Sequence, residues 1–262
     1  MPELIEVEMY RLAAEPVVGR TILRIDTPDA WYLRGGATPD AVRAALDGAR
    51  VLATARHGKL LLFPTSHGTT LGLRFGMTGR LVVDGEAPID RLEYSSGRVA
   101  EAWVRFRLAF DDGGELAVVD PRRLGGVELD PDRGRLGPEA STVTAAQLRA
   151  VLQRSGAPLK AVLLDQHRIA GLGNLLVDET LWTAGLDPAL PARSLDPDDV
   201  GRLAAVIRAT VRRLSRRGGS HTGNLQPARH RGALCPRCAT PLLRRTIGGR
   251  TTYSCPAEQS AP

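Results

Sequence analysis

Residues 158–185 read PLKAVLLDQHRIAGLGNLLVDETLWTAG, and this stretch says most about how the chain folds. Its apolar residues recur at helical spacing and predict one helix over 158–166 and a second helix that begins at Asn174. Between the two helices, Gly171 and Gly173 allow a sharp turn and a close approach of the backbone to a ligand. The stretch therefore predicts a helical hairpin with a tight connection.

The start of the second helix is suited to an anion. Asn174 is expected to cap this helix, and the N–H groups of a helix N-terminus favour a phosphate group. A hairpin that serves only the fold would show the same pattern. Both interpretations stay open on these residues alone.

The sequence on both sides of this hairpin is also helical. Thr144 and Gln147 form a capping box that opens a helix over 144–154. Asp196 opens a long amphipathic helix whose last turn is rich in arginine, as the negative end of a helix dipole favours. Residues 218–233 have the composition of a loop.

Residues 1–130 have a different pattern, in which short apolar runs alternate with turn signals. The runs that predict strands are 21–27, 51–56, 59–64, 70–75, 80–83, 104–110 and 116–119. We therefore expect an α+β fold. An N-terminal β-sandwich domain with an N-terminal helix covers 1–130, a linker covers 131–143, a helical domain covers 144–220, and a β-hairpin of the zinc-ribbon type covers 230–262.

Charge is spread unevenly along the 262 residues. The region from Val200 to the end contains 12 Arg and one acid, whereas the first 199 residues carry a net charge of −5. A basic region on a near-neutral body suggests a polyanionic partner, with nucleic acid the first choice and a membrane surface the second. No apolar run reaches the length of a membrane span, and we expect a cytoplasmic, nucleoid-associated protein without a membrane partner.

Lysine is scarce in a chain rich in basic residues. Of 35 basic residues, 33 are Arg, and Lys occurs only at positions 59 and 160. Arg replaces Lys easily as a solvated charge but not where a compact ammonium group is needed. Lys59 follows the expected turn at His57-Gly58, where a side chain can project toward a ligand.

The tail contains residue types that bind metal ions, namely Cys235, Cys238, Cys255 and Glu258. The spacing is that of a zinc ribbon, in which paired ligands fix a β-hairpin. A carboxylate in the fourth position is uncommon in structural zinc sites. Three interpretations compete: zinc bound by these four residues, zinc with His221 or His230 as the fourth ligand, and a ribbon that folds without metal.

The N-terminus admits both a structural and a chemical interpretation. Pro2 and Glu3 suit the first turn of an ordinary helix. If Met1 is removed, however, Pro2 carries a secondary amine whose pKa near ~8 leaves a useful fraction neutral and nucleophilic at pH 7. Glu3 beside it could transfer protons.

Together these motifs resemble the formamidopyrimidine-DNA glycosylase and endonuclease VIII family of base-excision repair enzymes over nearly the whole chain. The stretches that carry the resemblance are Met1-Pro2-Glu3-Leu4-Ile5-Glu6-Val7-Glu8, His57-Gly58-Lys59, Phe75-Gly76-Met77-Thr78-Gly79-Arg80-Leu81, Asp120-Pro121-Arg122-Arg123, and the helical hairpin up to Gly185. Leu4 makes the N-terminus more similar to the formamidopyrimidine branch. The family implies a two-lobed protein that binds DNA between its lobes.

The resemblance implies a DNA glycosylase with abasic-site lyase activity. Pro2 would attack the sugar of a flipped-out nucleotide, Glu3 would move protons, Glu6 would support the network beside it, and Lys59 would assist at the neighbouring phosphates. Oxidised purines such as 8-oxoguanine or formamidopyrimidine are favoured as substrates. The alternatives are an oxidised-pyrimidine glycosylase of the endonuclease VIII type and a non-catalytic DNA-binding or damage-sensing protein on the same scaffold.

The resemblance also implies contacts with double-stranded DNA that contains oxidised bases or abasic sites, bound by a monomer. The residues expected to contact DNA are Arg74, Met77, Arg122, Arg123, Lys160, Asn174 and Arg250. Met77 and Arg122 would fill the space left by the flipped base. One structural Zn²⁺ is expected in the tail.

The sequence departs from the family pattern at five places. Ile5 stands where the family usually has Pro or one of a few other residues, and we expect little effect. Arg74 stands in place of a His and keeps its charge, and Leu124 stands in place of a Phe wedge. The segment 220–229 is shorter than the loop that covers 8-oxoguanine in the formamidopyrimidine branch, and Glu258 stands in place of the fourth Cys.

Overall fold

The computed structural model describes residues 2–89, 92 and 100–259. The chain forms two compact units, residues 1–133 and 134–262. The boundary falls inside the stretch 131–143 that the sequence predicts as a linker, and the finer division of the chain into four segments stays a prediction. Among the described residues, no helix is both long enough and apolar enough to cross a membrane.

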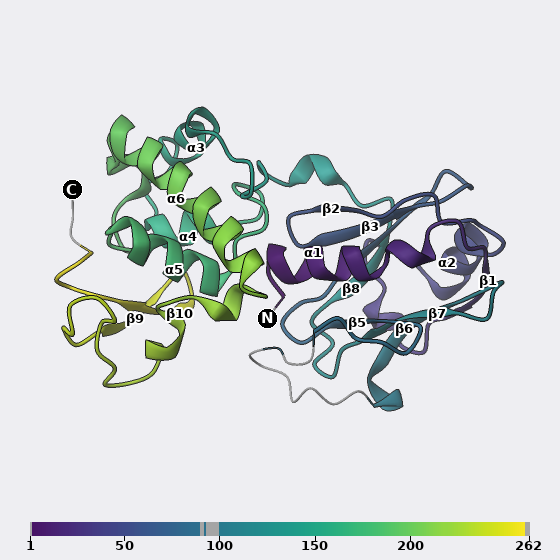
Figure 1. Ribbon diagram of the computed structural model, residues 1–262. Coiled ribbons are helices and arrows are strands. Elements are labelled where there is room, and N and C mark those ends of the chain that lie inside the picture. The colour runs from purple at the N-terminus through teal and green to yellow at the C-terminus, as the bar shows by residue number, and fades with distance from the viewer. Residues whose placement is uncertain (1, 90–91, 93–99, 260–262) are drawn as a thin grey trace. The chain divides into compact units, whose positions relative to one another are not determined.

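The first unit is a sandwich of two antiparallel four-stranded sheets with two helices (Figure 1). One sheet has the order β1-β6-β7-β5 and the other β2-β3-β4-β8. The strands are β1 (Ile22–Asp26), β2 (Ala55–His57), β3 (Leu60–Pro64), β4 (Thr70–Arg74), β5 (Arg80–Val83), β6 (Val104–Phe110), β7 (Glu115–Val119) and β8 (Gly126–Leu129). This confirms the predicted sandwich.

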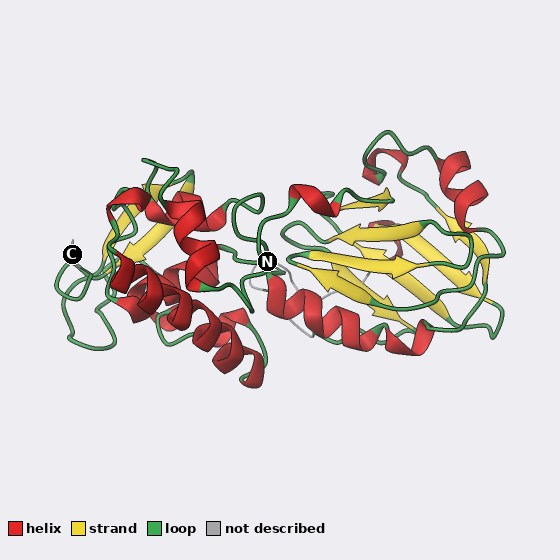
Figure 2. Cartoon of the chain, turned by 90° about the horizontal axis from the view of Figure 1, so that it is seen from above, coloured by secondary structure: helices red, strands yellow, loops and turns green. Residues whose placement is uncertain are grey.

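Apolar side chains from both sheets share one large core cluster in this unit, and a smaller cluster around Val82 and Val119 is separate from it. Phe106 of one sheet and Phe63 of the other belong to the same buried cluster. Helix α1 (Leu4–Ala13) lies along the strands (Figure 2) and packs against β2 and β3. Its Val7 and Tyr10 are buried in the core. The Tyr10 ring lies 4.5 Å from the ring of Phe75, which precedes the loop 76–79. The core thus fixes the helix that starts at Glu3.

The second unit is helical and ends in a β-hairpin. Its helices are α3 (Ala145–Leu152), α4 (Leu159–Leu164), α5 (Asn174–Ala184) and α6 (Pro197–Arg216), and its hairpin pairs β9 (Leu243–Ile247) with β10 (Arg250–Ser254). Helix α6 packs on α3 and α5. The predicted caps are confirmed: Thr144 accepts from the Gln147 N–H at 3.2 Å, and Asp196 accepts from the Asp199 N–H at 2.8 Å.

Two predicted details at helix and turn boundaries are wrong by one residue. Gly173, not Asn174, is the N-cap of α5, because the extended backbone ends at Gly173 and Asn174 is the first helical residue. The β2–β3 turn is Gly58-Lys59 rather than His57-Gly58, because His57 already pairs with Leu60. Lys59 therefore lies in the turn itself.

Several elements do not appear in the sequence-based description. Helix α2 (Pro39–Leu46) and strand β8 are both formed. Residues 218–233, predicted as loop, contain two short 3-10 turns, Ser220–Thr222 and Gln226–Ala228. Glu179 of α5 anchors this segment by accepting the N–H groups of Asn224 and Leu225 at 2.9 Å each.

Candidate active site and nucleic-acid interface

The predicted catalytic carboxylates lie at the buried start of α1. Glu3 is the N-cap residue and Glu6 is the third helical residue, so their spacing is that of a capping box. The Glu3 N–H donates to Glu6 Oε2 at 2.9 Å. Glu3 is fully buried, Glu6 is 3% exposed, and Pro2 is also buried. The first helical turn thus holds both carboxylates in a low-dielectric environment with fixed geometry.

Lys59 is carried by a hairpin that packs against the same helix. Gly58 takes a φ of +57° at the first position of the two-residue turn, where Gly is favoured. Arg56 of β2 donates to Glu8 Oε2 of α1 at 2.9 Å and to the Gly58 carbonyl at 2.8 Å. These contacts connect the turn that carries Lys59 to α1, at whose start Glu3 lies. Two stretches whose contacting residues are 48 positions apart in the sequence are thereby held together.

One buried carboxylate organises the two loops that were expected to enter DNA. Asp120, which is fully buried, accepts the Thr78 hydroxyl at 2.6 Å from the loop 76–79. It also accepts the N–H groups of Leu124 and Gly125, at 2.9 Å each, from the loop 121–125. Charge-assisted hydrogen bonds of this kind are roughly twice as strong as neutral ones. Both loop tips are therefore positioned by the same residue.

The predicted DNA-contacting residues on and beside these loops differ in exposure and in how many protein groups hold their side chains. Met77 is half-buried and Arg122 is exposed. Arg74 is held by Glu128, to which its Nε donates at 2.6 Å. Arg123 has a φ of +57° and makes a bidentate ion pair with Asp29 at 2.6 and 2.7 Å. The Arg123 guanidinium group lowers the pKa of Asp29 below its usual range. Arg122 is thus the more available of the two adjacent arginines.

In the second unit, two predicted residues meet at one backbone carbonyl, and a third is adjacent to it in the chain. The Asn174 Nδ2 and the Lys160 Nζ each donate to the Thr251 carbonyl at 3.2 Å. Arg250 is the preceding residue and is exposed beside the Gly248-Gly249 turn of the hairpin. The Asn174 amide has a second N–H to offer to a ligand. The start of α5 and the β9–β10 hairpin are therefore joined at the Thr251 carbonyl, and we refer to this junction as the Thr251 corner.

Lys160 lies behind this corner rather than on its surface. Its ammonium group is fully buried and donates to Asp178 Oδ1 at 2.6 Å and to the Thr252 hydroxyl at 2.8 Å. Arg229 pairs with the other oxygen of Asp178. Burial raises the pKa of Asp178, while Lys160 and Arg229 act in the opposite direction. A direct contact between Lys160 and DNA stays a prediction, because all these partners belong to the protein.

The three cysteines of the tail form a site that can hold a metal ion. Cys235, Cys238 and Cys255 have their sulfur atoms within 4.8 Å of one another, and among the described residues no other such group is present. The Cys238 and Cys255 sulfur atoms are 3.5 Å apart. Tetrahedral zinc with Zn–S bonds of ~2.3 Å needs sulfur atoms about 3.7 Å apart. The donor set and its spacing therefore fit zinc.

The electrostatic environments of two of these thiols differ. Burial acts to raise the pKa of Cys235, but the hydrogen bond from Trp182 Nε1 at 3.4 Å and two backbone N–H groups outweigh it and lower this pKa to about 7. Burial raises the pKa of Cys255 to about 11. Cys235 therefore reaches the thiolate form that a metal ion requires at a lower pH than an ordinary cysteine does.

The cluster of Cys235, Cys238 and Cys255 provides three metal ligands and leaves the fourth undefined. The carboxylate of Glu258 pairs with Arg237 at 3.1 Å, and the Arg237 guanidinium group lies 3.9 Å from the centre of the Trp182 ring. His230 has its Nδ1 at 3.1 Å from the Arg231 carbonyl, and both it and His221 are exposed. Ligation by Glu258, or by either His, stays a prediction.

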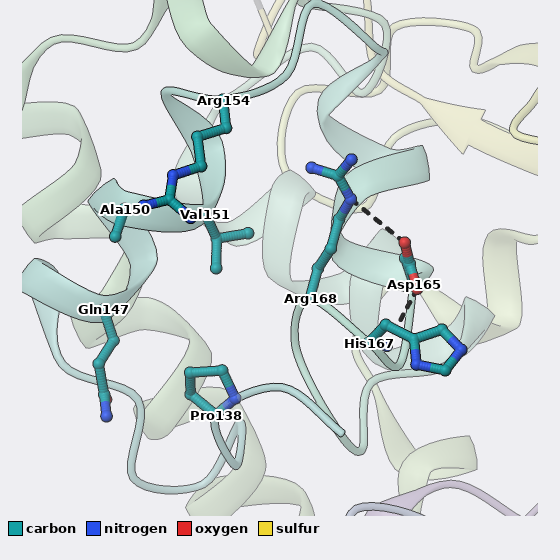
Figure 3. Close-up of a pocket in the computed structure, with 8 residues that line it drawn as sticks. All are labelled: Pro138, Gln147, Ala150, Val151, Arg154, Asp165, His167 and Arg168. Carbon is teal, nitrogen blue, oxygen red and sulfur yellow. Dashed lines mark hydrogen bonds and ion pairs between the residues drawn. The ribbon is translucent and has the colours of Figure 1, made fainter. Parts of the chain in front are cut away.

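A separate open pocket of about 570 Å³ lies between α3 and the turns that precede α5 (Figure 3). Its lining includes Arg154, Arg168 and Asp165, of which the last two form an ion pair at 3.2 Å. The His167 N–H donates to Asp165 as well. None of the predicted catalytic or DNA-contacting residues lines this pocket.

The sequence interpretation did not identify two residues that organise these sites. Asp120 was treated only as part of a motif, although an acid before Pro121 at a strand end often bonds backbone N–H groups two or more residues later. Asp178 lies in a helix buried almost throughout its length. A carboxylate in such a helix needs a cationic partner, which was a readable signal.

Comparison with known proteins agrees with this arrangement. Residues 1–127 match the family model described as the formamidopyrimidine-DNA glycosylase N-terminal domain, and residues 136–224 match its H2TH domain. The formamidopyrimidine-DNA glycosylase of Chloroflexus aurantiacus is 34% identical over 99% of this chain and 98% of its own length. That of Symbiobacterium thermophilum is 37% identical over 100% of this chain and 90% of its own length.

Solved structures show the same similarity. The Lactococcus lactis Fpg in complex with DNA that contains an abasic site has a TM-score of 0.83 and 25% identity, with 99% of this chain and 100% of that chain covered. The complex of the same protein with DNA containing an N7-benzyl-Fapy-dG lesion has a TM-score of 0.84 at 25% identity.

The fold and the positions of its motifs define a two-unit protein of the DNA glycosylase class. The chain belongs to the formamidopyrimidine-DNA glycosylase family. The resemblance inferred from the sequence motifs is thereby confirmed.

Proposed function

We propose that this protein is a bifunctional enzyme that excises oxidised purines from double-stranded DNA and then cleaves the strand at the resulting abasic site. The observation that carries the proposal is Pro2-Glu3 at the buried start of α1, in a chain similar to formamidopyrimidine-DNA glycosylases over nearly its full length. The protein acts as a monomer in the cytoplasm, where it has access to the nucleoid.

The reaction begins with the amine of Pro2 once Met1 has been removed. The nitrogen attacks C1′ of the flipped nucleotide, and the glycosidic bond breaks with its electron pair leaving on the base, which takes up a proton. Opening of the sugar ring gives an iminium ion, and Glu3 protonates the released O4′. Glu6, which accepts the Glu3 N–H at 2.9 Å, supports this network.

The iminium ion then makes strand cleavage possible. It acidifies the C2′ proton, and transfer of this proton to the Glu3 carboxylate gives an enamine with a C1′–C2′ double bond. The enamine electrons then form a C2′–C3′ double bond as the 3′-phosphate leaves, which restores the iminium ion. Loss of the C4′ proton drives a second elimination that forms a C4′–C5′ double bond and releases the 5′-phosphate, and hydrolysis of the imine frees Pro2. Lys59, on the turn that Arg56 ties to α1, contacts the phosphates next to the lesion and stabilises their charge.

DNA is held through its backbone by groups in both units. Asn174, Arg250 and Arg74 contact phosphates, with Lys160 fixing the corner at Thr251 from behind. Met77 and Arg122 fill the space that the flipped base leaves. Because these contacts are largely charge-assisted, affinity falls as the salt concentration rises.

Reductive trapping tests the chemistry directly. Borohydride should convert the Schiff base with an abasic duplex into a covalent protein–DNA adduct. The adduct should disappear in Pro2→Gly and in protein that retains Met1, while the matched control Pro16→Gly, at an exposed position after α1, should form it normally. Correctly processed protein that gives no adduct would overturn the proposed activity in favour of a non-catalytic DNA-binding role.

A lesion panel tests the substrate class. Duplexes with 8-oxoguanine or formamidopyrimidine should be cleaved faster than a duplex with thymine glycol. The reverse order would assign the protein to oxidised pyrimidines. The segment 220–229 is the place to look for the cause, because Glu179 holds it against α5.

We further propose that one Zn²⁺ is bound by Cys235, Cys238 and Cys255, with Glu258 as the fourth ligand. The ion would hold the β9–β10 hairpin in place and take no part in the reaction. Ligation would require Glu258 to leave Arg237, whose guanidinium group keeps its contact with the Trp182 ring.

Elemental analysis tests the metal. The parent protein should contain about one zinc per chain by this ligand count, and Cys235→Ala should contain none. Glu258→Ala should bind zinc more weakly in competition with a chelator, whereas His230→Ala should not. Equal zinc retention by Glu258→Ala and the parent would exclude Glu258 as a ligand.

A further inference from the structure

A large aromatic side chain stands exposed in the first unit. Trp31 is 56% exposed and lies in a short 3-10 turn, Ala30–Tyr32. The residue after it in the turn, Tyr32, is fully buried. The Tyr32 hydroxyl lies 3.3 Å from Asp120 Oδ2, to which it donates. The turn that presents Trp31 is therefore anchored to the same carboxylate that positions the loop 121–125.

Two guanidinium groups lie over the Trp31 ring. The Arg34 Cζ is 4.2 Å and the Arg123 Cζ is 4.9 Å from the ring centre. Each is also held by a second contact: Arg34 donates to the Gly125 carbonyl at 2.9 Å, and Arg123 makes its bidentate pair with Asp29. Both cations are thus fixed in place independently of the ring.

The exposed loop tip beside this ring supplies further contact groups. Arg34 links Trp31 directly to the loop, since it donates both to the Trp31 carbonyl at 3.1 Å and to Gly125. Leu124, immediately before Gly125, is 46% exposed. We refer to Trp31, Arg34, Arg123 and Leu124 as the Trp31 surface.

The chemistry of the Trp31 surface favours a nucleic acid strand. Aromatic rings and arginine side chains together provide stacking surface and positive charge, which is how proteins bind nucleic acid strands with little regard to base sequence. The acid in the cluster, Asp29, is 10% exposed in its side chain and paired with Arg123, so it offers little repulsion to phosphate.

We propose that the Trp31 surface binds the undamaged DNA strand, next to the base left unpaired when the lesion is flipped. This inference rests on the proposed function, in which the loop 121–125 enters the gap opposite that base. Side chains beside the loop then meet the complementary strand. Trp31 supplies an aromatic surface at a loop whose own wedge position holds the aliphatic Leu124. Because stacking strength differs among the bases, Trp31 contributes a modest preference among opposite bases.

Binding to a non-cleavable duplex with a tetrahydrofuran abasic analogue tests the proposal at fixed salt. Trp31→Ala should weaken binding about tenfold, since stacking on one aromatic residue contributes at this level. Trp31→Phe keeps an aromatic ring and should stay within about threefold of the parent by the same argument. Leu52→Ala, which removes another exposed apolar side chain of the first unit, should change nothing.

The identity of the strand is tested by varying the base opposite the analogue. Trp31→Ala should reduce the spread of affinities among the four opposite bases, whereas general loss of a phosphate contact would lower all four equally. Parent-like affinity and parent-like discrimination in Trp31→Ala would overturn the inference while leaving the proposed function intact. Failure of the parent protein to form the borohydride adduct would instead overturn the proposed function, and this inference with it.

Discussion

Buried carboxylates are used differently in the two units. In the first, Glu6 accepts a backbone N–H at the start of α1, and Asp120 accepts backbone N–H groups and hydroxyls from two loops. In the second, Asp178 and Glu179 pair with cationic side chains from other elements, including Lys160 and Arg213, and Glu179 also accepts two backbone N–H groups of the segment 220–229. The first arrangement shapes local backbone around reactive or DNA-contacting groups, whereas the second joins helices and hairpin into a frame.

The difference follows from what each unit has to join. In the sandwich, a large apolar cluster drawn from both sheets holds the two layers together. The helical unit must attach a small hairpin and an irregular segment to α5. Asp178 joins α5 to α4 through Lys160 and to the irregular segment through Arg229, and Lys160 in turn reaches Thr252 of the hairpin.

The largest expected effect separates chemistry from stability in the first unit. Glu3→Gln should lower the rate of strand cleavage by roughly 10²- to 10⁴-fold, the range for loss of a general acid–base group. Its unfolding midpoint in urea should stay near that of the parent. Glu15→Gln, an exposed acid just after α1, should leave the rate unchanged. A full rate in Glu3→Gln would contradict the role assigned to Glu3.

The second prediction concerns the buried ion pairs that join α4, α5 and the hairpin in the second unit. Lys160→Met should lower the free energy of unfolding by about 3–5 kcal/mol, because the buried Asp178 loses one of its two cations. Urea titration measures this loss. Arg202→Met removes an ion pair with Asp199 in which the Arg side chain is 54% exposed, and it should cost less than about 1 kcal/mol. Equal losses in the two variants would show that burial of an ion pair does not raise its contribution to the free energy of unfolding.

A third substitution tests whether Asp120 serves the loops. Asp120→Asn places an amide group among backbone N–H donors, and one unsatisfied donor costs about 1–3 kcal/mol. DNA affinity should fall as well, since the loops 76–79 and 121–125 lose their shared anchor. Calorimetry and a binding titration together measure the effect. Asp40→Asn, on a side chain that is 95% exposed, is the matched control and should be silent in both.

The smallest effect is a pH-dependent one at Asp29. Since the pKa of Asp29 is lowered by Arg123, its ion pair contributes stability that is present above the ordinary Asp pKa of ~3.9 and is lost as the pH falls through the lowered value. Asp29→Asn should lower the melting temperature by roughly 1–3 °C at pH 7. The difference should shrink as the pH falls below ~3.9 and should vanish once the pH lies below the lowered pKa of Asp29. A difference that grows on acidification would contradict the direction of this pKa shift.

Local signals account for the features that the sequence predicted well. The capping box at Thr144 and the cap at Asp196 each involve residues three apart, and both helices begin where these signals place them. Strand alternation likewise gave the sandwich. Helix α2 had a signal of the same type, since Thr38 accepts the Ala41 N–H at 3.2 Å before Pro39, and it could have been predicted.

Features that depend on contacts between residues far apart in the chain could not be predicted from the sequence. Nothing near Lys160 indicates that its ammonium group is buried, because its partners are 18 and 92 positions away. The linkage between the loops 76–79 and 121–125 through Asp120 likewise spans 42 positions. The helix start at Pro2 and Glu3 and the turn beside Lys59 were predicted from the residues, whereas a shared catalytic role for the three was expected from family resemblance alone.

The contact at Thr251 has a consequence for how the second unit tolerates change. The group that both Lys160 and Asn174 bind is a main-chain carbonyl, so its chemistry does not depend on the side chain at position 251. What the contact does depend on is the register of β10 against β9, in which Thr251 lies opposite Thr246. A shift of one residue reverses which face of a strand each group occupies. The hairpin should therefore accept varied residues at this position while rejecting single-residue insertions or deletions in its turn.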